Sequence, residues 1–213
     1  LIMKKLLVIL VLTLLCSKAI AFTSPTLTDT EDVSSQDSGP RGLAFNNDGT
    51  KFYLTSLNNK EINVYNLTTA WDLTTAVHKC AEPHWTTGND NARDIAFNAD
   101  GTYMFIVRGG DGGTDYVYRY LLSAPFDVCD GYTRGSGSNS SYVLGGSNYI
   151  NINSEQTRTN GLAFSPDGKN MYITGTVGAE VNQYTLATAW DLSTAVHGGL
   201  FAFEASSGET EPM

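Results

Sequence analysis

The pattern of apolar and polar residues occurs twice along the chain in nearly the same form. Residues 42–78 open with the apolar run Gly-Leu-Ala-Phe and reach a turn at Asp48-Gly49. Residues 161–197 follow the same pattern, and the two stretches are identical at 21 of 37 aligned positions. Asp-Gly between two apolar runs predicts a β-hairpin, because Gly adopts positive φ at no steric cost and the Asp side chain bonds the following backbone. Each stretch is therefore a structural repeat that begins with two antiparallel strands.

Two further segments complete each repeat. The run 52–55 after the turn is rich in aromatic and β-branched residues, and the segment 62–67 alternates with a period of two. A tail with the sequence Ala-Trp-Asp-Leu follows at 70–73, and the Thr-Ala-Val-His run after it suits a short fourth strand at a sheet edge. Each repeat is predicted to form a four-stranded antiparallel sheet.

A divergent third repeat lies between these two copies. It starts at Asp94, so the three repeats begin at residues 42, 94 and 161. We expect the second sheet to span 94–130, with a Gly/Ser-rich insert at 131–146 forming a surface loop before the third. The equivalent turn and tail positions are Asp48, Gly49 and Trp71; Asp100, Gly101 and Phe126; and Asp167, Gly168 and Trp190.

Units of about 40–50 residues with four strands each are typical of a β-propeller, in which blades pack radially because one such sheet cannot bury both of its faces alone. The segment 163–174, Ala-Phe-Ser-Pro-Asp-Gly-Lys-Asn-Met-Tyr-Ile-Thr, resembles the Ser-Pro-Asp-Gly…Tyr-Val-Thr-Asn blade of lactonase-like and surface-layer β-propellers. The resemblance covers 42–213 and implies fold more than function. The prediction is an all-β partial propeller of about three four-stranded antiparallel blades, a fragment of a propeller with about six to eight blades.

The first 21 residues are predicted to be a secretory signal peptide, with a basic start, an apolar core at 6–15 and Ala19-Ile20-Ala21 as a cleavage site. The core is shorter than the roughly 20 residues of a membrane span. A lipoprotein signal ending at Cys16 is an alternative. We expect a secreted, periplasmic or cell-surface protein with no transmembrane segment after cleavage.

Residues 22–41 are expected to lead into the first blade. Residues 205–213 align with 33–41, which predicts that another blade begins after residue 213.

The charge balance restricts the classes of partner. The chain has 13 Lys and Arg against 22 Asp and Glu, a net charge of −9, and three of the lysines lie in the predicted signal. Because nucleic-acid binding needs a basic surface that neutralises phosphates, we expect no nucleic-acid partner. A protein, a glycan or a small molecule remains as the unknown ligand.

Cysteine and acidic residues give few signs of a metal site. Export would allow a disulfide between Cys80 and Cys129, and the sequence leaves open whether they pair. No ligand pairs have zinc spacing. The glycine-rich segment 109–115 is interpreted as a hairpin tip, because it lacks the spaced acids and closing Glu of a calcium loop. We predict no metal and no cofactor.

No catalytic motif is present, so no catalytic residue is assigned. His78 and His197 occupy equivalent repeat positions, which indicates that they support the blade. The tail aromatics are expected to pack between blades, with a sugar-stacking platform as the alternative. The residues that differ between repeats, in the connections that lead into each blade, are the predicted ligand contacts: Arg41, Arg93 and Asn160.

The function predicted from these patterns is an exported, non-enzymatic binding or interaction scaffold. A lactonase-like hydrolase is the alternative implied by the resemblance. Such enzymes place acids and a His or Asn at the channel mouth, often with a divalent metal, and no such set can be matched in this sequence. A structural component of a surface layer or a virion is the third alternative.

Overall fold

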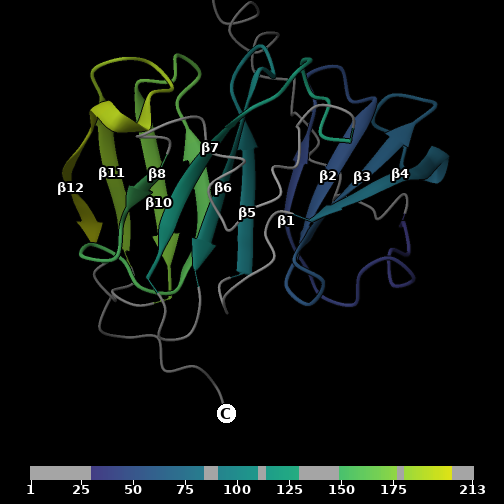
Figure 1. The fold of residues 1–213 in the computed structure, drawn as a ribbon, viewed down its shortest axis with the longest axis horizontal. Helices are drawn as coiled ribbons and strands as arrows, with labels where there is room; N and C mark the ends of the chain where they lie inside the picture. The colour runs from purple at the N-terminus through teal and green to yellow at the C-terminus, as the bar shows by residue number, and fades with distance from the viewer. Residues whose placement is uncertain (1–29, 84–90, 110–113, 130–148, 177–179, 203–213) are drawn as a thin grey trace, which may run out of the picture. The chain divides into compact units, whose positions relative to one another are not determined.

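The computed structural model describes residues 30–83, 91–109, 114–129, 149–176 and 180–202 (Figure 1). The predicted signal peptide, the insert 131–146 and the segment 205–213 lie outside these described residues. All the strands belong to one unit, Glu31–Met213. Within the described segments, no helix has the length and apolarity needed to cross a membrane.

The first and third blades have the predicted meander. The first contains β1 (Pro40–Phe45), β2 (Lys51–Ser56), β3 (Glu61–Leu67) and β4 (Ala76–Pro83), paired in that order. The third contains β9 (Thr159–Phe164), β10 (Asn170–Gly175), β11 (Glu180–Leu186) and β12 (Ala195–Ala202). All neighbouring strands are antiparallel. A turn of 3-10 helix precedes the last strand of each of these blades: η1 (Leu73–Thr75) in the first and η2 (Leu192–Thr194) in the third.

The second blade differs from the prediction in its last strand. It contains β5 (Asn91–Phe97), β6 (Tyr103–Gly109), β7 (Tyr116–Leu121) and β8 (Tyr149–Asn151). The prediction that the second sheet spans 94–130 was wrong, because its fourth strand, β8, comes from residues after the insert 131–146. The insert therefore interrupts the blade instead of separating it from the next one.

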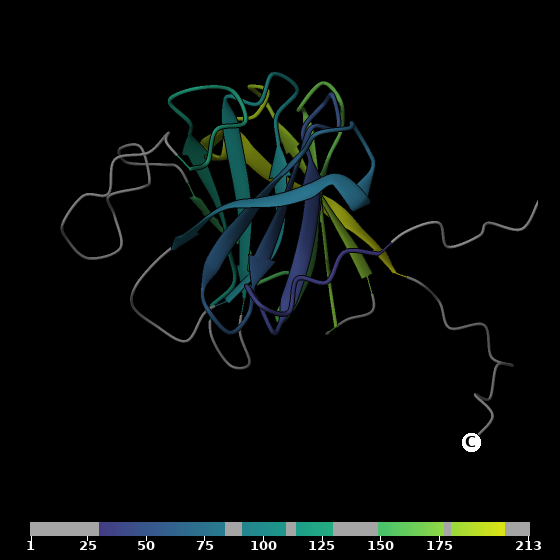
Figure 2. The ribbon, with the colours of Figure 1, turned by 90° about the vertical axis from the view of Figure 1, so that its right-hand side faces the viewer.

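The three blades are neighbours, with their first strands adjacent to one another. Strand β5 contacts both β1 and β9 (Figures 1 and 2). One buried apolar cluster joins the first two blades and includes Tyr53 and Ile106, and a second joins the last two and includes Phe105 and Met171. The prediction of a partial β-propeller with three four-stranded blades is confirmed.

The hairpin turns have the geometry that Asp-Gly predicts. Gly49, Gly101 and Gly168 have φ of 70°, 72° and 69°. Each turn glycine also lies against the aromatic ring of its own blade's tail. A Cβ on Gly168 would lie 2.1 Å from a ring carbon of Trp190, so the ring leaves no room for a larger residue.

The expectation that the tail aromatics pack between blades agrees with the surroundings of two of them: Phe126 packs against the apolar cluster of the first two blades, and Trp190 against that of the last two. Trp71 and Phe126 cover the turn glycine of their own blade in the same way as Trp190. Of the three tail rings, Trp190 also has a ring–ring contact with a described residue of the neighbouring blade, at 5.9 Å from the ring of Phe105. Trp71 is 60% exposed.

Contacts between blades also use the tail backbone. Phe126 and Trp190 have positive φ of 57° and 64°, and their carbonyl groups accept hydrogen bonds from the preceding blade. The Tyr53 hydroxyl donates to the Phe126 oxygen at 2.6 Å, and Arg119 donates to the Trp190 oxygen at 2.7 Å. The equivalent tail carbonyl therefore accepts a hydrogen bond from a tyrosine at the first interface and from an arginine at the second.

The first interface also contains a covalent link. Cys80 in β4 and Cys129 after the second tail form a disulfide, with a Cα–Cα distance of 6.0 Å. Lys79 and Asp127, next to these cysteines, form an ion pair at 3.4 Å.

The two described histidines are used within their blades. His78 Nε2 lies 3.1 Å from Oδ1 of the buried Asn63, and His197 Nε2 lies 2.9 Å from Oδ1 of the buried Asn182. These equivalent pairs support the interpretation that both histidines support the blade.

Candidate functional site

A β-bulge near the start of each first strand positions the three predicted ligand contacts. The pairing register shifts between Pro40 and Leu43 in β1, between Ala92 and Asp94 in β5, and around residue 160 in β9. Arg41, Arg93 and Asn160 are the residues at these irregularities. Bulges re-aim side chains and occur often beside functional sites. We call this end of the three strands the bulge end.

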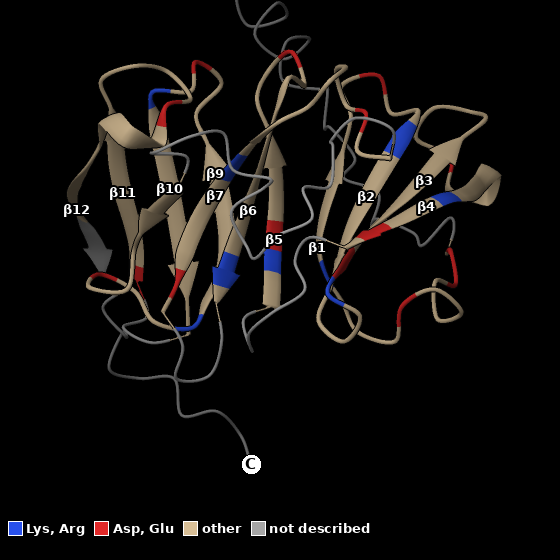
Figure 3. Cartoon of the chain, viewed as in Figure 1, with Lys and Arg blue, Asp and Glu red and all other residues tan. Residues whose placement is uncertain are grey.

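The three side chains have different surroundings. Arg41 and Asn160 are exposed, whereas Arg93 is half-buried and donates from Nε to the backbone oxygen of Gly109 at 3.1 Å. Basic and acidic residues lie next to each other on β5, and a basic residue ends β6 (Figure 3). The two guanidinium groups come from the neighbouring strands β1 and β5, at an end of the strands that also carries the acidic Asp94.

Asp94 is a further polar residue at this end that the sequence analysis did not select. It stands where the other repeats have Gly42 and Gly161. Its Oδ2 accepts the N–H of Leu162 in β9 at 2.8 Å, and a Cβ on Gly42 would lie 2.7 Å from its Oδ1. The carboxylate therefore lies between the first strands of all three blades. An acid at a position occupied by Gly in the other repeats was the signal that could have identified it.

Burial changes the acidity of Asp94. Desolvation raises its pKa above the ordinary value of 3.8, against the lowering effect of hydrogen bonds from the N–H groups of Leu162 and Ile95. The charged form of a half-buried carboxylate is disfavoured because burial removes part of its hydration. A nearby guanidinium or a ligand hydroxyl would be a favourable partner for it.

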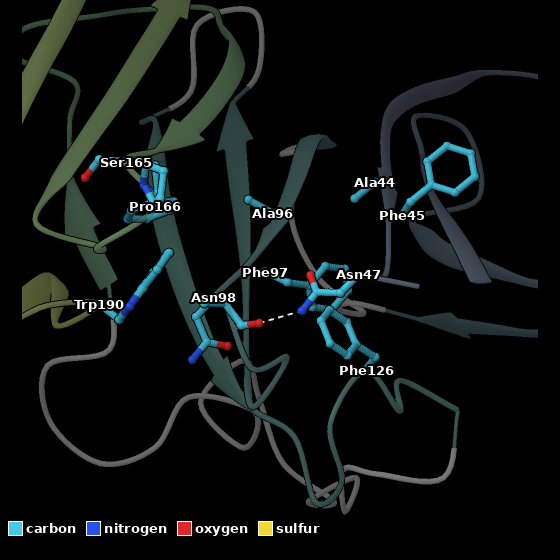
Figure 4. Close-up of a pocket in the computed structure, with 12 residues that line it drawn as sticks. Ala44, Phe45, Asn47, Ala96, Phe97, Asn98, Phe126, Ser165, Pro166 and Trp190 are labelled. Atoms are coloured by element: carbon cyan, nitrogen blue, oxygen red, sulfur yellow. Dashed lines mark hydrogen bonds between the residues drawn. The ribbon is translucent and has the colours of Figure 1, made fainter. Parts of the chain in front are cut away.

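The opposite end of the same strands, which we call the turn end, contains a cavity of about 410 Å³ (Figure 4). Figure 4 shows the rings of Phe97 and Phe126 near the amide of Asn47, whose Nδ2 donates to the Ala99 oxygen at 2.6 Å. None of the described residues that line this cavity is charged. Its lining residues are Ala44, Phe45, Asn47, Ala96, Phe97, Asn98, Ala99, Phe126, Phe164, Ser165, Pro166 and Trp190.

The polar groups of the turn end are already used by the turns. Asp48 accepts the N–H and O–H of Thr50, and Asp100 accepts the same groups of Thr102. Hydrogen bonds from these threonine hydroxyls, and then from the backbone, lower the pKa of both carboxyls. These acids stabilise hairpins and do not converge on a common point. In the part of the chain that the structure describes, no three His, Cys, Asp or Glu residues come together as metal ligands.

Comparison with known proteins agrees with the blade geometry. The family model described as "Lactonase, 7-bladed beta-propeller" matches residues 19–124. The chain resembles the lactonase-like β-propellers in its fold. No curated protein gives a sequence match.

Solved structures show the same lactonase-like propeller fold. A candidate 6-phosphogluconolactonase from Bacteroides fragilis NCTC 9343 matches with a TM-score of 0.51 and 17% identity, over 78% of this chain and 39% of that protein. A second, from Bacteroides uniformis ATCC 8492, matches with a TM-score of 0.50 and 14% identity, over 78% of this chain and 41% of that protein. This chain thus spans about two fifths of the length of these structures, and the likeness concerns their fold.

Proposed function

We propose that this chain forms part of a lactonase-like propeller that binds a small anionic lactone or sugar acid at the bulge end. Arg41 and Arg93 would hold the anionic group, Asn160 would bond a hydroxyl or carbonyl, and Asp94 would accept a ligand hydroxyl. The observation that carries this proposal is that three repeat-equivalent polar residues, two arginines and one asparagine, occupy the same bulge on adjacent first strands.

The chemistry of the arginines determines the proposed ligand class. A guanidinium group is planar, always charged, and matches carboxylate and phosphate oxygens with paired hydrogen bonds. Two such groups on neighbouring strands favour an anion over a neutral sugar. The names of the matching family and of the similar structures, lactonase and 6-phosphogluconolactonase, support a sugar acid or its lactone as that anion.

Hydrolysis of the lactone is the activity we propose for the complete propeller. A binding scaffold that holds the same ligand without converting it is the second candidate. The observation that favours the second candidate is that His78 and His197, which could have served as general bases, pair with buried asparagines inside the blades.

Export is also part of the proposal. The predicted signal peptide and the Cys80–Cys129 disulfide both support a secreted, periplasmic or cell-surface location, because disulfides persist in oxidising compartments.

Calorimetric titration tests the site directly. We expect 6-phosphogluconate and gluconate to bind, and neutral glucose to bind at least about tenfold more weakly, since a bidentate pair to a charged group contributes about 1.5–3 kcal/mol. Arg41→Ala and Arg93→Ala should each weaken 6-phosphogluconate binding by about tenfold or more. Lys169→Ala removes an exposed cation at the turn end and is the matched control.

The outcome that would remove the proposal is equal binding by all four proteins, or binding of glucose as tight as that of the anions. Turnover of a panel of lactones by the complete propeller separates the two candidates. Hydrolysis that depends on both arginines supports the enzyme, and tight binding without turnover supports the scaffold.

A further inference from the structure

Asp115 is a buried carboxylate at the interface between the second and third blades. It precedes β7 and has an exposed fraction of 0%. Its Oδ2 accepts both the N–H and the hydroxyl of Thr159, each at 2.6 Å. The other oxygen, Oδ1, has no hydrogen-bond partner among the described residues. One half of this carboxylate joins the blades and the other half is unused.

An unpaired charge in this position is costly. Burial of a carboxylate without a compensating charge is strongly unfavourable, and buried charges in proteins are paired with an opposite charge or bind metals. In the described part of the chain, no Lys, Arg or His forms an ion pair with Asp115. A buried polar atom without a partner calls for an explanation such as an ion or an ordered water.

Gln156 is a second buried polar side chain without a hydrogen-bond partner among the described residues, and it lies close to the same part of the sheet. It is 2% exposed, and neither its Oε1 nor its Nε2 has a partner in the described segments. Its amide lies against Gly175, where a Cβ would come within 2.7 Å of the amide carbon. Gly175 is paired with Thr159 in the sheet. Asp115 and Gln156 therefore flank one pair of residues, Thr159 and Gly175.

The first blade has a side-chain hydrogen bond at this position, although Oδ2 of its buried carboxylate, Asp37, also has no partner among the described residues. Asp37 and Ser56 are the repeat equivalents of Gln156 and Gly175. The Ser56 hydroxyl donates to Asp37 Oδ1 at 2.9 Å. The third blade has Gly175 in place of that serine, so the buried amide of Gln156 has no such hydroxyl beside it and no partner among the described residues.

We propose that a hard cation, with calcium as the probe, binds between the second and third blades through Asp115 Oδ1 and Gln156 Oε1. Carboxylate and amide oxygens are ligands that calcium accepts, and backbone carbonyls or waters complete its coordination. With one carboxylate the site is weak, with a dissociation constant on the order of 10⁻⁴ to 10⁻³ M, as in extracellular calcium modules. The cation would compensate the buried charge and join the two blades.

Thermal and chemical unfolding of the whole chain, with calcium or with a chelator, tests this proposal. Calcium at about 100 times its dissociation constant should lower the unfolding equilibrium constant about 100-fold. Asp115→Asn should abolish this effect. Asp48→Asn is the matched control, because it removes an exposed carboxylate and leaves an Asn-Gly turn; it should keep the calcium response.

Gln156→Met keeps the test decisive if Asp115→Asn does not fold. If Gln156 is a ligand, the methionine variant binds calcium at least about tenfold more weakly. If no cation binds there, replacing an unpartnered buried amide by an apolar group of similar shape makes the protein more stable in chelator and leaves calcium without effect. The proposal is overturned by a wild-type protein that does not respond to calcium together with variants that are more stable than wild type.

Discussion

The bulge end and the turn end belong to the same three strands, but the residues at the turn end recur in all three repeats and those at the bulge end do not. At the turn end all three repeats carry Asp-Gly with an aromatic ring over the glycine. At the bulge end the equivalent residues are Arg41, Arg93 and Asn160, and the next position changes from Gly to Asp94 and back. Positions that recur in all three repeats stabilise each blade, and the proposed ligand contacts fall where the third repeat departs from the first two.

The acids at the two ends show the same contrast in their ionisation. Hydrogen bonds from neighbouring hydroxyl and N–H groups lower the pKa of Asp48, Asp100 and Asp167. Desolvation raises the pKa of Asp94. The turn acids therefore favour the folded state when charged, and Asp94 favours it when protonated.

The largest expected effect is at a turn glycine. Gly168→Ala forces a side chain into positive φ and against the Trp190 ring, so we expect a loss of about 3 kcal/mol in the free energy of unfolding. Gly198→Ala is the control, because its Cβ would meet its nearest neighbour at 3.6 Å. Denaturant unfolding measures both, and similar losses in the two variants would contradict the role of the turn.

The tail rings should differ according to their burial. Trp190→Ala removes contacts with Phe164 and Phe105, and we expect a loss of about 2–3 kcal/mol in stability. Trp71→Ala, at a ring that is 60% exposed, should lose about 1 kcal/mol or less. Equal losses measured by thermal unfolding would show that the neighbouring blade adds nothing to this ring.

The pH dependence of stability should have opposite signs at the two ends. The contribution of Asp94 is present below its ordinary pKa of 3.8 and is lost as pH rises through its raised value. As the pH rises from about 3 to about 7, the free energy of unfolding of Asp94→Asn should therefore increase relative to that of wild type.

Asp100→Asn is the comparison at the turn end. The contribution of Asp100 is present above 3.8 and is lost as pH falls through its lowered value, so this variant should be less stable than wild type at neutral pH and equal to it in acid. The free energy of unfolding of both variants is measured over this pH range. If it changes with pH in the same way for both, the acids at the two ends do not differ in how they affect stability.

The smallest effect on stability is expected at the bulge arginines. Arg41→Ala should change the free energy of unfolding by less than about 0.5 kcal/mol, because the side chain is exposed. Arg93→Ala should cost slightly more, since it loses the hydrogen bond to Gly109. A large loss of stability in Arg41→Ala would show that this end supports the fold and would weaken its assignment as a binding surface.

Much of the fold could be predicted because its signals are local. Asp-Gly turns and alternating segments marked the strands of the first and third blades, and alignment of the repeats placed Arg41, Arg93 and Asn160 at equivalent positions. Strand β8 was missed because its three residues follow a long insert and carry no repeat signal. The packing of each tail ring on its own turn glycine was not predicted, because it depends on how the chain folds back within a blade.

The sequence by itself determined the blade, its turns and the number of copies, because hairpin chemistry and a period of two act between residues close in the chain. Tertiary structure alone decided that Asp94 lies between three strands. It also decided that Oδ1 of Asp115 and the amide of Gln156 lie beside one residue pair without hydrogen-bond partners among the described residues. Burial and desolvation depend on neighbours far away in sequence, so no local pattern can reveal them.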